Sequence, residues 1–173
     1  EFRRVLFRSQ STSAGSLMHD LLEKYVKGEE WPERGTNPLR VTSFVMAEQI
    51  IKEALEPSLD EAWGLEAKLY YPGVYAGTTD LVGIWEGDDA IIDFKNSRKP
   101  KKREWIDDYF IQTVAYGKAH NAMFGTNIRK GVILMASRED EHLGTVQKFV
   151  IEGDDWSKYS AMFAERIKQF FAY

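Results

Sequence analysis

The sequence predicts a single α/β domain in which helices pack on a mixed β-sheet. Apolar residues recur at helical spacing in four segments and alternate at strand spacing in five others, in the order ααβββαββα. No internal repeat or long linker interrupts that order. The 173 residues suffice for one domain, and the 43% of hydrophobic residues supply its core.

Composition excludes several classes of protein and of site. The chain has no Cys, which excludes disulfides, thiolate zinc sites, iron–sulfur clusters and Cys nucleophiles. Any metal must therefore bind carboxylates, carbonyls or one of three His, a ligand set that favours Mg²⁺ or Mn²⁺. The net charge of −4 argues against a protein that coats nucleic acid, although a local basic patch is compatible with it. No window approaches the ~18 apolar residues of a membrane span, so we expect a cytoplasmic protein with no membrane partner.

The first nine residues, EFRRVLFRS, resemble the in-frame translation of a common sequencing adapter. We therefore expect residues 1–9 to be an artefact that is not part of the fold. Residues 10–173 then form one domain, which we expect to lack its native N-terminus.

The N-terminal part predicts two helices. In residues 13–27, Ser13 is a candidate cap and is followed by apolar residues at helical spacing. Residues 28–40 contain two Pro and two Gly, which indicate a loop. Thr42 or Ser43 is then expected to cap a second helix that ends near Glu56, before Pro57.

The remaining chain predicts the sheet and two further helices. Strands at 63–70, 75–86 and 90–96, separated by Pro72-Gly73 and Gly87-Asp88 turn signals, form an antiparallel meander. A helix at 104–124 is expected to end at Gly125. Strands at 129–137 and 143–151 follow it. The last helix begins near Asp154 or Asp155.

Charged residues converge at one end of the predicted sheet. Strand alternation places Asp93 and Lys95 on one face of 90–96, a strand that is otherwise apolar on both faces. With Gly87-Asp88 as a two-residue loop, Asp80 lies opposite Lys95 and diagonal to Asp93. Glu66 of the first strand is a candidate third carboxylate. Buried charges are costly unless they pair or hold a metal, so a structural salt bridge and a metal site both remain open.

Four motifs in order resemble the PD-(D/E)XK nuclease superfamily, and most closely its RecB-like exonuclease branch, which includes phage exonucleases and the mitochondrial genome maintenance exonuclease. The branch has G-x-x-x-H, G-x-x-D, D-[FW]-K-[TS] and Q-x-x-x-Y. The matching segments here are Gly15 to His19, Gly77 to Asp80, Asp93-Phe94-Lys95, and Gln112 with Tyr116. The resemblance covers residues 15–135 and departs at Asn96, where the family usually has Thr or Ser.

The resemblance implies a restriction-endonuclease-like core and a Mg²⁺- or Mn²⁺-dependent deoxyribonuclease without an iron–sulfur cluster. It implies that Asp80, Asp93 and the Phe94 carbonyl hold the metal, and that Lys95 orients or helps deprotonate the attacking water. His19 is then a metal-side ligand or substrate contact. Gln112 and Tyr116 are expected to reach toward the active site and the DNA.

A basic segment directly follows Lys95 and is a candidate binding site for DNA phosphates: Arg98, Lys99, Lys101, Lys102 and Arg103. Trp105 lies beside it and could stack on a base.

We expect an exonuclease that acts on single-stranded DNA ends. Three alternatives remain open: a structure-specific or restriction-type endonuclease on the same fold, a catalytically silent nucleic-acid-binding domain, and an unrelated α/β domain with a structural salt bridge. Tyr109 and Met123 are expected to belong to the core, and His120 and His142 to be structural or surface residues.

Overall fold

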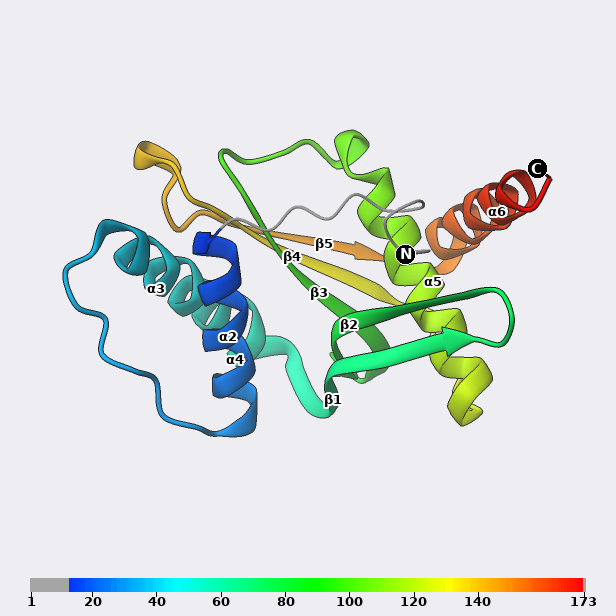
Figure 1. Cartoon of the computed structure of the whole chain (residues 1–173), viewed down its shortest axis with the longest axis horizontal. Helices are drawn as coiled ribbons and strands as arrows, with labels where there is room; N and C mark the ends of the chain where they lie inside the picture. Colours follow the sequence, from blue (N-terminus) through cyan, green and yellow to red (C-terminus); the bar gives the residue numbers. More distant parts are fainter. Residues whose placement is uncertain (1–12, 173) are drawn as a thin grey trace.

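A five-stranded mixed sheet with helices on both faces forms the body of the protein (Figure 1). The computed structural model describes residues 13–172, so the expected artefact at residues 1–9 lies outside the described part. The predicted α/β class and the order of the main elements are confirmed. Among the described residues, no helix has both the length and the apolar character that crossing a membrane requires.

The strands lie side by side in chain order: β1 (Leu59–Tyr71), β2 (Tyr75–Trp85), β3 (Asp88–Ser97), β4 (Gly131–Ser137) and β5 (Val146–Ile151). The first three strands form the expected antiparallel meander, β3 pairs with β4 in parallel, and β5 pairs antiparallel with β4. Helix α5 (Asp107–Phe124) connects the two parallel strands. Because β4 is covered on both faces, its sequence is almost continuously apolar, and the apolar residues of β3 lie in its middle, from Ala90 to Phe94.

Two apolar clusters cover the two faces of β3. On one face, α2 (Ser13–Lys27) and α3 (Pro38–Ile50) pack against Ala90, Ile92 and Phe94. On the other face, α5 and α6 (Gly153–Phe170) pack around Ile91. The alternation predicted for β3 is therefore confirmed, and it directs Asp93 and Lys95 toward α5.

The start of α3 differs from the prediction of a cap at Thr42 or Ser43. The helix begins at Pro38, and the Asn37 side chain accepts hydrogen bonds from the backbone N–H groups of Leu39 and Arg40. Proline suits this first position because it has no N–H to leave unsatisfied. Ser43 is buried instead, where its hydroxyl lies within hydrogen-bond distance of the Ala14 carbonyl and so links α3 to α2. Beyond α3 the chain continues through a π-helical turn, η1 (Ile51–Leu55), and the short α4 (Glu56–Ser58).

The β2–β3 hairpin has a different register from the predicted one. Its two loop residues are Glu86 and Gly87, with φ of 46° and 86°, rather than Gly87 and Asp88. Positive φ at both central residues is what a type I′ turn requires, and this turn matches the twist of the strands. Trp85 consequently pairs with Asp88. The register shifts by two residues and brings Asp80 level with Asp93 instead of Lys95.

The helix predicted at 104–124 is shorter than expected. Arg103–Trp105 form a separate 3₁₀ turn, η2, and α5 begins at Asp107. Trp105 is 64% exposed and lies outside the α5 face that carries Gln112 and Tyr116. The strand predicted at 143–151 begins only at Val146, because a second 3₁₀ turn, η3 (Asp140–His142), and Gly144 with φ of 82° precede it.

Candidate active site

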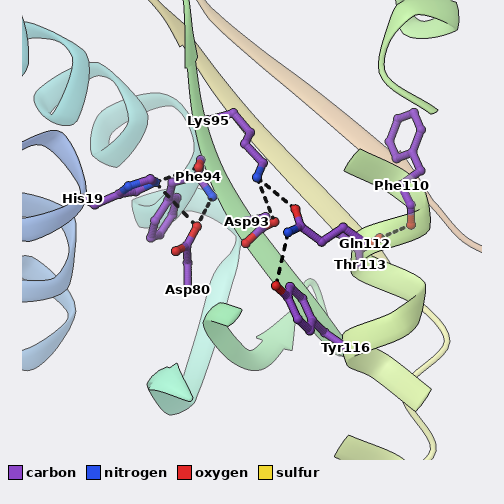
Figure 2. Close-up of polar contacts among 9 residues, drawn as sticks. All are labelled: His19, Asp80, Asp93, Phe94, Lys95, Phe110, Gln112, Thr113 and Tyr116. Atoms are coloured by element: carbon purple, nitrogen blue, oxygen red, sulfur yellow. Dashed lines mark hydrogen bonds and ion pairs between the residues drawn. The ribbon is translucent and has the colours of Figure 1, made fainter. Parts of the chain in front are cut away.

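The site forms where β2 separates from β3. Backbone pairing between these strands ends at Leu81 and Ile92, so the peptide of Phe94, two residues further along β3, has no partner on β2. The Asp80 carboxylate accepts the Phe94 N–H at 2.8 Å, and His19 Nε2 donates to the Phe94 carbonyl at 2.7 Å (Figure 2). Side chains from β2 and α2 thus replace the missing backbone pairs, as buried peptide groups require.

Asp80 and Asp93 form a close, coupled pair of carboxyl groups. Burial raises the pKa of Asp80 well above its usual range, and the neighbouring charge of Asp93 raises it further. Burial also opposes ionisation of Asp93, but Lys95 and the hydrogen bond from Asp80 outweigh it and lower the pKa of Asp93. The metal-free site therefore favours one ionised carboxylate, Asp93, and one that retains its proton, Asp80.

Lys95 is held by three groups on the α5 side of β3. Its Nζ lies 3.4 Å from Asp93 Oδ2, donates to Gln112 Oε1 at 3.0 Å, and stands 4.7 Å from the centroid of the Tyr109 ring. Gln112 in turn donates from Nε2 to the Tyr116 hydroxyl at 3.2 Å (Figure 2). The buried amide thus has a partner at each end, which fixes it and, through it, the ammonium group.

Gly77 provides the space in which Tyr116 lies. A Cβ at position 77 would stand 2.7 Å from Tyr116 Cε1 and 3.1 Å from its hydroxyl oxygen. No side chain other than hydrogen leaves room for the ring in this position. The glycine of the G-x-x-D motif is thereby connected, through Tyr116 and Gln112, to Lys95.

His19 is neutral in this arrangement. Burial lowers its pKa, and the hydrogen bond to the Phe94 carbonyl opposes that shift only in part. Since a carbonyl can only accept, His19 Nε2 carries the proton. The same nitrogen lies 3.6 Å from Asp80 Oδ2, so the imidazole, the Asp80 carboxyl and the Phe94 carbonyl face one another.

The donor set fits a hard divalent cation. Among residues 13–172, no three His, Asp or Glu side chains are already grouped as a metal cage. Asp93 Oδ2 is nevertheless buried without a hydrogen bond. Burial and the charge of Asp93 both oppose ionisation of the Asp80 carboxyl group. A cation near both carboxyl groups would favour ionisation of Asp80 and would add a second partner to Asp93 Oδ2, beside the Lys95 ammonium at 3.4 Å. Asp80, Asp93 and the Phe94 carbonyl are the residues that would hold it.

Glu66 does not become a third carboxylate of this group. It is exposed on the edge strand β1, with φ of 47°, in the gap between the pairs Leu65–Leu81 and Ala67–Thr79. This irregular backbone breaks the alternation on which the expectation rested. Glu66 instead acts electrostatically on Lys27 of α2.

The basic segment adjoins the site but is not part of the carboxylate cluster. Arg98 pairs with Glu139, and the charged ends of Lys101 and Lys102 lie near the rings of Tyr109 and Trp105. Tyr109 is the residue that sequence reasoning missed, because its ring contacts Lys95 rather than lying wholly in the core. Its position three residues before Gln112 on the same helix face was the signal that could have found it.

The fold has a counterpart among solved structures. A candidate exonuclease from Eubacterium rectale matches with a TM-score of 0.58 and 13% identity, over 97% of this chain and 69% of its own. Two more distant structures are SSO0001, with a TM-score of 0.40 and 14% identity over 93% and 87% of the two chains, and an alkaline exonuclease from Laribacter hongkongensis, with 0.35 and 13% over 97% and 88%. No family profile and no curated protein sequence matches the chain. The first likeness establishes a shared α/β fold with a mixed sheet.

Replacing Asp80 by Asn is expected to stabilise the metal-free protein at high pH. The folded state holds the Asp80 proton more tightly than the unfolded chain does because the folded pKa is raised. This contribution to stability is full below the unfolded pKa and is lost as pH rises through the folded pKa. An amide cannot ionise, yet its oxygen can still accept the Phe94 N–H. Urea unfolding in chelator should show an advantage for the variant that grows by about 1 kcal/mol or more between about pH 4 and about pH 8.

The exposed Asp140 provides the control, because Asp140→Asn removes a carboxylate outside the cluster. It measures the effect of losing one exposed carboxylate under the same conditions. An advantage of Asp80→Asn that does not grow with pH relative to this control would contradict the raised pKa of Asp80.

Gly77→Ala is expected to destabilise the fold by displacing Tyr116. The added methyl group overlaps the ring, so the Gln112–Tyr116 hydrogen bond is lost and the free energy of unfolding falls by about 1–3 kcal/mol. In a Tyr116→Ala background the same substitution meets open space and should cost much less. A double-mutant cycle of denaturant unfolding measures the coupling.

Gly64→Ala is the control, since a Cβ there meets only the Ala67 side chain at 3.6 Å. Equal costs of Gly77→Ala in both backgrounds would disprove the steric argument.

Proposed function

We propose that the protein is a Mg²⁺- or Mn²⁺-dependent deoxyribonuclease that hydrolyses phosphodiester bonds at single-stranded DNA ends. The observation that carries the proposal is the convergence of Asp80, Asp93 and Lys95 where the β2–β3 pairing ends. The fold shared with the candidate exonuclease from Eubacterium rectale supports it as well. So does the order of the four motifs that resemble RecB-like exonucleases.

The acidic side of the site suits metal-assisted hydrolysis. Asp80, Asp93 and the Phe94 carbonyl offer oxygen ligands of the kind that Mg²⁺ and Mn²⁺ prefer. Such an ion supplies Lewis-acid polarisation of a phosphoryl oxygen and activation of water. His19 orients the Phe94 carbonyl through its hydrogen bond, and the same Nε2 lies 3.6 Å from Asp80 Oδ2.

Lys95 supplies the basic side of the site. Gln112 and Asp93 fix its Nζ beside the carboxylates, where the ammonium can orient the attacking water and offset the negative charge that develops at the phosphorus. Tyr116 acts through Gln112 and is a positioning residue. Because each of these groups is held before substrate arrives, little reorganisation accompanies the reaction.

One assay separates the proposal from its alternatives. End-labelled linear single strands, circular single strands and blunt duplexes are incubated with Mg²⁺, Mn²⁺ or chelator. We expect linear single strands to be degraded only with metal, circular strands to survive, and circular dichroism in chelator to show an intact fold. Cleaved circles would indicate an endonuclease, and DNA binding without cleavage would indicate a silent binding domain. Full activity in excess chelator would exclude the metal-dependent reaction.

Asp93→Asn and Lys95→Ala are expected to have different effects on metal binding, although both should impair cleavage. Asp93→Asn replaces a carboxylate by a neutral amide and so removes a full negative charge beside the cation. Both Mn²⁺ binding and cleavage should therefore be lost. Removing the Lys95 ammonium relieves repulsion of the cation, so Mn²⁺ affinity should hold or rise while cleavage falls by about 10²-fold or more. Calorimetric Mn²⁺ titration and a cleavage assay on the two variants measure the difference.

The structural salt-bridge alternative predicts another result for the same pair. Both substitutions would then lower stability, by as much as about 3–5 kcal/mol for a buried pair, and neither would alter metal binding. Thermal melts of the two variants test this. Cleavage at the parental rate by Lys95→Ala would remove Lys95 from the mechanism.

A further inference from the structure

A cavity of about 410 Å³ continues the site beyond the end of β3. It is lined by residues 97–101, by Trp105 and by Arg138, and we call it the Trp105 pocket. Its volume is in the range of small-ligand sites. Ser97 lies two residues beyond Lys95 on the same strand, a step of about 7 Å, so the pocket begins next to the candidate catalytic group.

Cationic side chains dominate the lining of the pocket. Arg98, Lys99, Lys101 and Arg138 all border it. Glu139 pairs with Arg98 and also interacts electrostatically with Lys99 and Arg138. The Arg138 guanidinium donates from Nη1 to the neutral Asn96 side chain at 2.9 Å, and the residues that line the pocket include no carboxylate of their own. An excess of positive charge in a concave site favours an anionic ligand such as a phosphate.

The walls of the pocket are fixed by hydrogen bonds. The Lys101 N–H donates to Gln147 Oε1, and Gln147 Nε2 donates to the Lys101 carbonyl, each at 2.8 Å. Ser97 donates to the Lys99 carbonyl at 2.6 Å. A basic segment tied to β5 in this way presents its charges in a set geometry.

An aromatic ring is available beside these charges. Trp105 is 64% exposed, and the Lys102 ammonium lies 5.5 Å from its ring centroid. The Tyr109 ring connects the pocket to the site, since Lys95 Nζ lies 4.7 Å and Lys101 Nζ 5.7 Å from its centroid. An unpaired nucleotide offers what this arrangement can bind: a phosphate for the cations and a π-face for the indole.

We propose that the Trp105 pocket binds the unpaired nucleotide next to the bond that is cleaved, with Trp105 stacked on its base and Arg138 and Lys99 contacting its phosphate. The inference rests on the proposed function, because that function supplies a DNA strand in the adjoining site. Inside a duplex the neighbouring base pairs cover both faces of each base, so the indole can stack only on an unpaired or terminal base. The pocket therefore gives the enzyme its preference for single strands.

The test measures binding of a fluorescent single-stranded oligonucleotide by anisotropy in chelator, where cleavage does not interfere. A single abasic site is moved along the strand. We expect Trp105→Ala to weaken binding about tenfold, as loss of one stacked base does. One abasic position should weaken binding of the parent protein by a similar factor and should have no further effect on Trp105→Ala. Trp105→Phe should retain most of the affinity.

Two matched variants complete the design. Trp63→Ala removes another exposed tryptophan, one that stacks on His120 about 20 Å along α5 from Trp105, and should leave binding unchanged. Arg138→Gln should lower the slope of log affinity against log salt by about one, independently of the abasic position.

The outcomes separate this inference from the proposed function. Abasic effects that add to Trp105→Ala at every position would overturn the pocket even if the parent protein cleaves DNA with Mg²⁺. The expected non-additivity, found in a protein that cleaves nothing, would support the pocket and overturn the nuclease. A parent protein that binds no single-stranded DNA would overturn the pocket directly.

Discussion

The early separation of β2 from β3 is the constraint on which the rest of the site depends. Had the two strands stayed paired beyond Leu81 and Ile92, the backbone of β2 would occupy the edge of β3 where the Phe94 N–H and carbonyl lie. Separation leaves a buried peptide group that needs partners, and an unsatisfied one costs about 1–3 kcal/mol. Asp80 and His19 satisfy it, so the same two hydrogen bonds that complete the sheet bring a carboxyl and an imidazole to the middle of the fold.

The charges of the site are better explained by chemistry than by stability. Lys95 offsets the charge of Asp93, and a structural salt bridge would account for these two residues alone. It leaves Asp80 unexplained, because burial and the Asp93 charge both oppose its ionisation. The hydrogen bond to the Phe94 N–H accounts for a polar residue at position 80, but an amide would accept that bond without the cost of ionisation. The proposed metal site gives a reason for a carboxyl group there.

Sequence patterning predicted the layers of this fold but not its fine geometry. Period-two alternation in β3 placed Asp93 and Lys95 on one face of the strand, and the structure shows that α5 covers this face. The hairpin register escaped prediction because it depends on Glu86, a residue whose positive φ no composition rule indicates. The placement of Glu66 escaped prediction for a related reason, because alternation assumes a regular strand and Glu66 has a positive φ of 47°. Such deviations are set by tertiary packing, and one sequence does not display them.

The glycine at position 77 shows how a motif residue can act without any side chain of its own. Its missing Cβ makes space for Tyr116, whose hydroxyl accepts from Gln112, whose carbonyl oxygen accepts from Lys95. The first contact joins β2 to α5, the second lies within α5, and the third joins α5 to β3. The ammonium is therefore placed by packing between β2 and α5 as well as by its own strand. It follows that the G-x-x-D and Q-x-x-x-Y motifs form one structural unit in this protein, in which the glycine and the tyrosine determine where the lysine stands.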